Sequence, residues 1–126
     1  MQSKLPNFEL EWGEATRYPE FVQLGKSGWI SLVSKGKKMR ITSAHDINNT
    51  DAITPNAFQT LDINKVSRVL QQFVIGSVEM PIVAFYDDGF KELIGGNTRL
   101  TGMLETFGYA DIWVFHVSEE VSSIVK

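Results

Sequence analysis

The sequence predicts an α+β fold, in which a small mixed sheet is flanked by helices and preceded by a β-hairpin extension. Two observations support this class. Short apolar runs of strand character recur between residues 81 and 117, and apolar residues at helical spacing separate two of these runs. The chain has 126 residues, of which 43% are hydrophobic, which is enough to bury one core. We therefore expect residues 1–126 to form a single domain.

The N-terminal part carries the less regular pattern. Residues 7–20 are rich in aromatic side chains and should form an irregular arm that packs through them. Residues 28–33 and 39–42 have the composition of short strands and flank a turn at residues 34–37, which predicts a β-hairpin. Residues 46–54 are rich in Asn and Asp, which hydrogen-bond their own backbone, so they should form a loop.

The middle of the chain predicts one or two helices within residues 55–74, because its apolar residues mostly follow helical spacing. Thr54 and Pro55 are a suitable cap and first helical position. Asp62 could start a second helix in the same stretch, so one helix and two helices both remain open.

The next elements are a strand pair. Residues 81–86 form an apolar run that predicts a buried strand, and residues 90–94 predict its partner. Asp88 and Gly89 between them are a strong signal for a hairpin turn.

A helix and a strand complete the core. Four apolar residues, at 100, 103, 104 and 107, recur at helical spacing, so a helix should run over residues 97–107 and stop at Gly108. Residues 111–117 predict the last core strand, and residues 118–120 open a short terminal helix with acids at its positive end.

Composition excludes several classes of site. The chain has no cysteine, which excludes disulfides, thiolate metal sites and cysteine nucleophiles, and which fits a cytoplasmic location. Its two histidines form no zinc-binding cluster. The first ten residues lack the apolar run of a signal peptide, and no stretch approaches the roughly 18 apolar residues of a membrane span. The net charge of −3 gives no general argument for nucleic-acid binding.

The most informative stretch is the predicted turn from a strand into the helix at residues 97–107. Gly95 and Gly96 allow a sharp turn and a close approach by a ligand, because neither has a Cβ. The first N–H groups of the helix, at Asn97, Thr98 and Arg99, should point outward with partial positive charge. Arg99 adds a planar set of donors that suits phosphate oxygens, so the stretch predicts an anion site.

The order of these elements resembles the N-terminal domain of ParB proteins and sulfiredoxin. In that superfamily a helix and a glycine lead into a strand with Pro-Ile, a hairpin with glycine follows, and the next strand ends in Gly-x-x-Arg at a helix start. The matching positions here are Gly76, Pro81, Ile82, Asp88, Gly89, Gly96 and Arg99. The resemblance covers residues 61–117, and residues 1–60 are an extension.

The resemblance implies that Gly95, Gly96, Asn97, Thr98 and Arg99 bind the phosphates of a nucleotide, with Mg²⁺ and a nucleoside triphosphate as cofactor. It implies nucleotide-dependent phosphoryl chemistry, by a kinase or an NTPase. The alternatives are a non-catalytic module that binds a nucleotide or nucleic acid, and a ParB-like nuclease. The likeness to small stand-alone members of the superfamily also suggests a bacteriophage or mobile-element origin.

Two differences from these families limit the functions that the resemblance implies. Sulfiredoxin has a cysteine after its glycine pair where this chain has Asn97, so sulfiredoxin activity is excluded. Chromosome-partitioning ParB proteins have an arginine pair after Gly-Glu and a following helix-turn-helix domain, and this sequence has neither.

Acidic residues near the turn are the candidate catalysts. Glu79 precedes the strand at residues 81–86 and could act as a general base or hold magnesium, or it could be an exposed loop residue. Arg99 would stabilise charge during phosphoryl transfer. Asp87 and Asp88 could bind a metal, although Asp-Gly is above all a turn signal.

The remaining candidates lie outside the turn. His45 beside Asp46 could be an oriented base, whereas His116, Trp113 and Phe115 fit a strand face or the core. A basic stretch could contact nucleic-acid phosphate with an aromatic residue stacking on a base, or it could be a solvated hairpin tip. Its residues are Trp29, Lys35, Lys37, Lys38 and Arg40.

Overall fold

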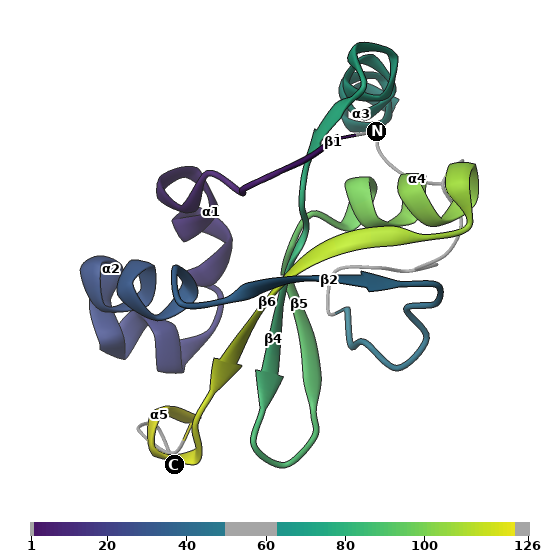
Figure 1. The fold of residues 1–126 in the computed structure, drawn as a ribbon. Coiled ribbons are helices and arrows are strands. Elements are labelled where there is room, and N and C mark those ends of the chain that lie inside the picture. The colour runs from purple at the N-terminus through teal and green to yellow at the C-terminus, as the bar shows by residue number, and fades with distance from the viewer. Residues whose placement is uncertain (1, 50–62, 123–126) are drawn as a thin grey trace.

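A four-stranded mixed sheet forms the centre of the computed structural model, which describes residues 2–49 and 63–122 (Figure 1). The strand order is β2-β6-β4-β5. β6 pairs antiparallel with β2 and parallel with β4, and β4 pairs antiparallel with β5. The bounds are Lys37–Ile41 for β2, Ile82–Tyr86 for β4, Lys91–Gly95 for β5 and Ala110–Val117 for β6. The predicted α+β class with a small mixed sheet is confirmed.

A second, two-stranded sheet joins the start of the chain to its middle. β1 (Gln2–Lys4) pairs parallel with β3 (Ser77–Glu79), and Lys4 lies opposite Glu79. This pairing holds the N-terminal strand beside the connection that leads into β4.

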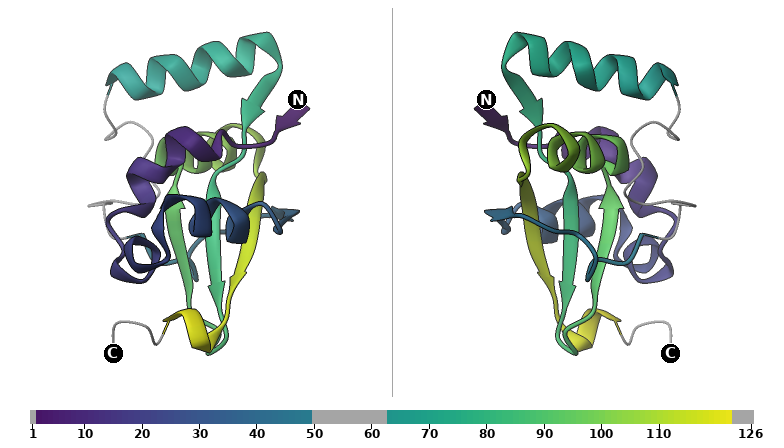
Figure 2. Two further views of the ribbon diagram at one scale, coloured as in Figure 1. Left: turned by 90° about the vertical axis from the view of Figure 1, so that its left-hand side faces the viewer. Right: turned by 90° about the vertical axis from the view of Figure 1, so that its right-hand side faces the viewer.

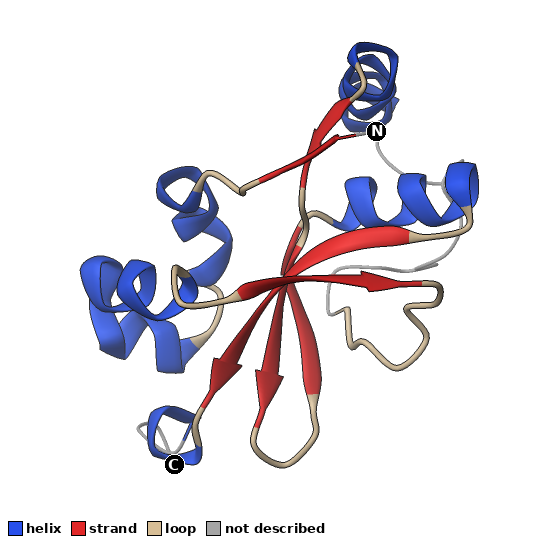
Figure 3. Ribbon diagram, in the orientation of Figure 1, coloured by secondary structure: helices blue, strands red, loops and turns tan. Residues whose placement is uncertain are grey.

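Helices cover both faces of the larger sheet (Figures 2 and 3). α1 (Phe8–Ala15) and α2 (Pro19–Val33) pack on one face, against β5 and β6. α4 (Asn97–Phe107) packs on the opposite face against β6, and α3 (Ile63–Ile75) lies on α4 and β3. The short α5 (Glu119–Ser122) follows β6 and contacts α2.

Alternation along the strands divides the core into two clusters, one on each side of the sheet. The cluster under α1 and α2 contains Phe21, Trp29, Val33, Ile82, Ala84, Ile94 and Phe115, with the half-buried Trp113 packed against it. The cluster under α4 contains Val83, Leu93, Leu100, Met103, Ile112 and Val114. Phe115 and Trp113 thus have the structural places that the sequence indicated.

The best-predicted elements are those of the C-terminal half. α4 has the predicted bounds, and Gly108 ends it in a left-handed conformation, with its N–H donating to the Leu104 carbonyl at 3.0 Å. The predicted hairpin joins β4 to β5, with Gly89 at φ 90° in its turn. The described part of residues 55–74 is helical from Ile63 onward. Thr54, Pro55 and Asp62 lie outside the described residues, as does the question of a second helix.

The predicted N-terminal β-hairpin is wrong, because residues 28–33 belong to helix α2. Pro19 occupies the first turn, and Phe21, Trp29 and Val33 are all buried in the core. Gly25 interrupts the helix with φ 78° and ψ 167°. This interruption breaks the sequence pattern and so hides the helix. Only the second predicted strand is present, as β2.

The predicted irregular arm at residues 7–20 is also wrong, since it contains α1. The Asn7 side chain caps this helix by accepting from the Leu10 N–H, and Glu9 and Glu11 place negative charge in its first turn. The expected aromatic packing is present: the Phe8 ring lies 6.0 Å from Trp113 and the Trp12 ring 5.9 Å from Trp29.

The segment after β2 forms the predicted loop over its described residues. Asn48 pairs with the edge of β5: its N–H donates to the Lys91 carbonyl and its carbonyl accepts from the Leu93 N–H, each at 2.8 Å. The loop thereby covers the outer edge of the sheet.

Candidate phosphate-binding site

The turn between β5 and α4 has the geometry of a helix start without a side-chain cap. Gly96 adopts φ 98° and ψ 28° and has no side chain that could accept from the helix. Among the described residues, no hydrogen bond is formed to the first N–H groups of α4, at Asn97, Thr98 and Arg99. These three groups and the positive end of the helix favour an anion at this place.

The space that the two glycines leave is taken by the chain itself. A Cβ on Gly96 would lie 2.8 Å from the Pro81 Cα and 2.9 Å from Arg99 Nη2. A Cβ on Gly95 would lie 2.5 Å from Glu11 Oε2. The glycines therefore allow a close approach, as predicted, but the approaching groups are a strand connection, a guanidinium and a carboxylate of α1.

Arg99 lies between two carboxylates. Its Nη2 donates to Glu11 Oε1 at 3.1 Å, and its Nη1 lies 4.0 Å from Glu79 Oε2. The Arg99 and Glu11 side chains are only 16% and 12% exposed, whereas Glu79 is 36% exposed. The buried Arg99 Nε has no partner within the described part of the chain. The guanidinium is thus held at the turn by Glu11, while its buried Nε–H donates to no described residue.

Glu79 lies where the sequence placed it, beside the turn, at the end of β3. Glu11 was missed. It is one of several acids in the first forty residues, and only the packing of α1 against β5 brings it to Arg99, 88 positions later in the chain. No local sequence signal could have identified it.

The Asn97 side chain has a structural partner, and the Thr98 side chain is buried. Asn97 Oδ1 accepts from Asn49 Nδ2 at 2.7 Å, which joins α4 to the loop after β2. Both residues therefore offer a ligand their backbone N–H groups rather than their side chains.

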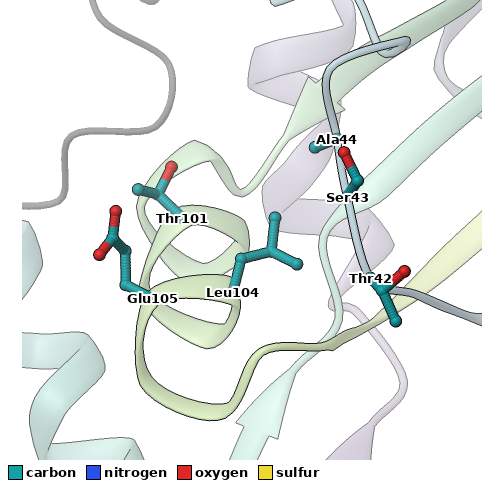
Figure 4. A pocket seen from close by; sticks show the side chains of 6 residues that line it. All are labelled: Thr42, Ser43, Ala44, Thr101, Leu104 and Glu105. Atoms are coloured by element: carbon teal, nitrogen blue, oxygen red, sulfur yellow. The ribbon is translucent and has the colours of Figure 1, made fainter.

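A cavity of about 330 Å³ opens beside the same helix (Figure 4). One wall is formed by Thr101, Leu104 and Glu105 of α4, and the other by residues 42–44 of the segment after β2. Its polar lining consists of three hydroxyl groups and one carboxylate, from Thr42, Ser43, Thr101 and Glu105. Thr101 also lies next to the turn, since its Oγ1 is 3.5 Å from Asn97 Oδ1.

His45 follows the residues that line this cavity and is hydrogen-bonded to Ser43 rather than to Asp46. Its Nδ1 forms a hydrogen bond with Ser43 Oγ. The Asp46 carboxylate instead accepts from Lys91 Nζ at 2.8 Å, and this bond lowers the pKa of Asp46. His45 and Asp46 therefore do not form the predicted pair in which the carboxylate orients the imidazole.

Asp87 and Asp88 have turn and capping contacts at the opposite end of the sheet. Asp88 Oδ1 accepts from the Phe90 N–H at 2.9 Å, which is the expected role in the hairpin. Asp87 accepts from the Glu119 N–H and pairs with the exposed His116. Over residues 2–49 and 63–122, no group of three or more histidines and acids is placed to hold a metal ion.

The predicted nucleic-acid surface is not brought together. Trp29 is completely buried in the core, so its predicted stacking on a base is wrong for this position. Arg40 is paired with Asp111 at 2.8 Å and lies 4.0 Å over the Tyr109 ring. Lys35, Lys37 and Lys38 are exposed near the start of β2, and nucleic-acid binding by these three remains a prediction.

In the part of the chain that the structure describes, no helix is both long and apolar enough to span a bilayer. Comparison of the chain with protein-family models, with curated proteins and with solved structures found no match.

Proposed function

We propose that this protein binds a nucleoside triphosphate, with its phosphates on the turn from Gly96 to Arg99, and catalyses phosphoryl transfer as a kinase or NTPase of the ParB/sulfiredoxin type. The observation that carries the proposal is the start of α4. There, N–H groups without a cap lie beside a guanidinium that is held in place by the fold. Such donors match phosphate oxygens in both charge and geometry.

The cavity beside α4 is the natural place for the nucleoside. An α-helix rises 1.5 Å per residue, so Thr101 and Glu105 lie about 6 and 12 Å along the helix from Asn97. One nucleotide spans this distance when its phosphates are on the turn. Hydroxyl groups of Thr42, Ser43 and Thr101 offer donors and acceptors to the base and sugar, and Leu104 offers an apolar contact.

Glu79 is the candidate for the chemical step. Its side chain is 36% exposed and lies 4.0 Å from Arg99 Nη1, beside the turn. Its carboxylate would either accept a proton from the attacking hydroxyl or water, or bind the Mg²⁺ that accompanies the triphosphate. Arg99 and the helix start would then stabilise the charge on the transferred phosphoryl group.

A non-catalytic nucleotide-binding module is the second candidate. The pairing of Arg99 with two carboxylates supports it, because Glu79 is then a structural partner of the arginine and leaves no general base at the turn. A nuclease would use the same turn for a nucleic-acid phosphate.

Calorimetric titration with ATP, GTP, CTP and UTP in the presence of Mg²⁺ tests the binding step, and analysis of nucleotide products tests turnover. We expect saturable binding that Arg99→Ala weakens about tenfold or more, the range for a lost charge-assisted hydrogen bond. Glu79→Gln should bind nucleotide but form no product if Glu79 acts in the reaction. Binding without product in the wild type would favour the module, and no binding of any nucleotide would refute both candidates.

A further inference from the structure

The carboxylate of Glu11 lies at the turn, beside Gly95 and bonded to Arg99. Glu11 Oε2 lies 2.5 Å from where a Gly95 Cβ would be, and Oε1 accepts from Arg99 Nη2 at 3.1 Å. Both side chains are largely removed from water. An ion pair with these properties is screened little, and its charge assistance makes it stronger than an exposed pair.

This contact lowers the attraction of the turn for anions. One guanidinium faces the carboxylates of Glu11 and Glu79, which leaves one net negative charge around Arg99. A ligand with a single negative charge would replace one carboxylate by another anion and would gain little. A triphosphate brings several charged oxygens, which can bind the N–H groups of α4 and the guanidinium together.

We propose that Glu11 is an internal ligand of Arg99 that a polyphosphate must displace, so that Glu11 sets the affinity of the turn and its selectivity for polyphosphates over monovalent anions. The proposal rests on the proposed function of the turn. Displacement requires only that the Glu11 side chain rotates toward solvent, because α1 is held independently by its Asn7 cap and by the packing of Trp12 on Trp29. No covalent step is involved.

Substitution of Glu11 should therefore strengthen ligand binding, which is the opposite of what a positioning role would give. We expect Glu11→Gln to bind inorganic triphosphate and ATP about tenfold or more tightly than the wild type, since one charge-assisted hydrogen bond no longer competes. It should also acquire measurable affinity for acetate or inorganic phosphate. Glu9→Gln is the matched control: it removes the same charge from the same helix, but Glu9 is exposed and pairs with Lys26.

A double-mutant cycle tests whether the gain in affinity acts through Arg99. The gain from Glu11→Gln should vanish when Arg99 is also replaced by alanine, because the competition runs through that guanidinium. All variants are first compared with the wild type by circular dichroism and thermal unfolding. If Glu11→Gln does not fold, the wild type is titrated with triphosphate and followed by NMR, where the Arg99 Nε–H and the Glu11 carboxyl signals must both shift together at saturation.

The outcomes separate the two proposals. Wild-type binding that Glu11→Gln leaves unchanged or weakens overturns the internal ligand while the proposed function stands, as does a Glu11 signal that does not move in the NMR titration. Equal gains in Glu9→Gln and Glu11→Gln would show a general charge effect and would also overturn it. No binding by the wild type or by Glu11→Gln refutes the phosphate site, and the internal ligand with it.

Discussion

Gly96 meets two separate requirements, a left-handed backbone and a close approach by Pro81 and Arg99. Gly89 in the hairpin meets only the first, because its φ is 90° but no atom of the described residues lies within 4 Å of a Cβ built there. The two glycines therefore form a matched pair in which only the steric contact differs.

Gly96→Ala should destabilise the protein more than Gly89→Ala does. The conformational strain of a left-handed alanine costs about 1–2 kcal/mol at either position. At Gly96 the methyl group would also collide with backbone, so we expect a total of about 3 kcal/mol or more. Urea unfolding of the two variants gives the difference directly. Equal losses of stability would contradict the close packing of the turn.

Arg99 and Glu11 show where prediction at the scale of single residues ends. Arg99 follows two glycines at the start of a helix, and that local pattern was sufficient to single it out. Glu11 becomes its partner only through the packing of α1 on the sheet. A contact across 88 positions depends on the complete fold, so no short stretch of sequence encodes it.

At the scale of elements, Asp111 joins β6 to two other strands. Its carboxylate accepts from Arg40 of β2 at 2.8 and 3.2 Å and from Ser3 Oγ of β1 at 2.7 Å. The Asp111 side chain is buried, and the hydrogen bonds from Arg40 lower its pKa more than burial raises it.

Acid should therefore weaken the contact between these strands. A carboxyl group with a lowered pKa in the folded state stabilises the fold fully above its unfolded pKa of about 3.9, and this contribution is lost as the pH falls through the lower folded pKa. We expect the unfolding free energy of Asp111→Asn to be lower than that of the wild type at pH 7. It should decline less steeply below about pH 4.

Denaturant unfolding at a series of pH values from 7 to 2 measures this effect. Asp88→Asn serves as the control, because Asp88 lies in an exposed turn and accepts from the nearby Phe90 N–H. Parallel curves for the wild type and Asp111→Asn below pH 4 would show that Asp111 does not titrate as part of this contact.

Elements differed in how well the sequence encoded them. α4 carries its helical spacing, its start and its end within eleven residues, so local rules were sufficient. α2 is interrupted by Gly25, which has a non-helical backbone, and its Trp-Ile-Ser-Leu-Val run also has strand character. Packing of Phe21 and Trp29 on Phe115 decides in favour of the helix, and that packing is tertiary.

At the scale of the whole molecule, the last long strand is the centre of the structure. β6 lies between β2 and β4 and supplies residues to both core clusters. The class of fold could be predicted because it depends on which elements occur. The position of β2 beside β6 could not be predicted, because it depends on the pairing of strands about seventy positions apart.

Two truncations test the role of β6. A chain that ends after residue 109 lacks β6 and should not fold, because β2 then has no partner and both clusters lose their central residues. A chain that ends after residue 118 keeps the sheet and should fold with reduced thermal stability, since it loses α5 with its contacts to α2 and to Asp87. Circular dichroism with thermal unfolding distinguishes them, and a cooperative transition in the shorter chain would contradict this organisation.

The late position of β6 also has a consequence for synthesis on the ribosome. The helices α1 and α2 leave the ribosome long before the strand that they cover, since most of their apolar partners lie in residues 82–117. At translation rates of about 5–20 residues per second, their apolar faces stay uncovered for on the order of several seconds. An uncovered apolar segment of this kind is what chaperones bind, and this core cluster can be completed only after β6 has left the ribosome.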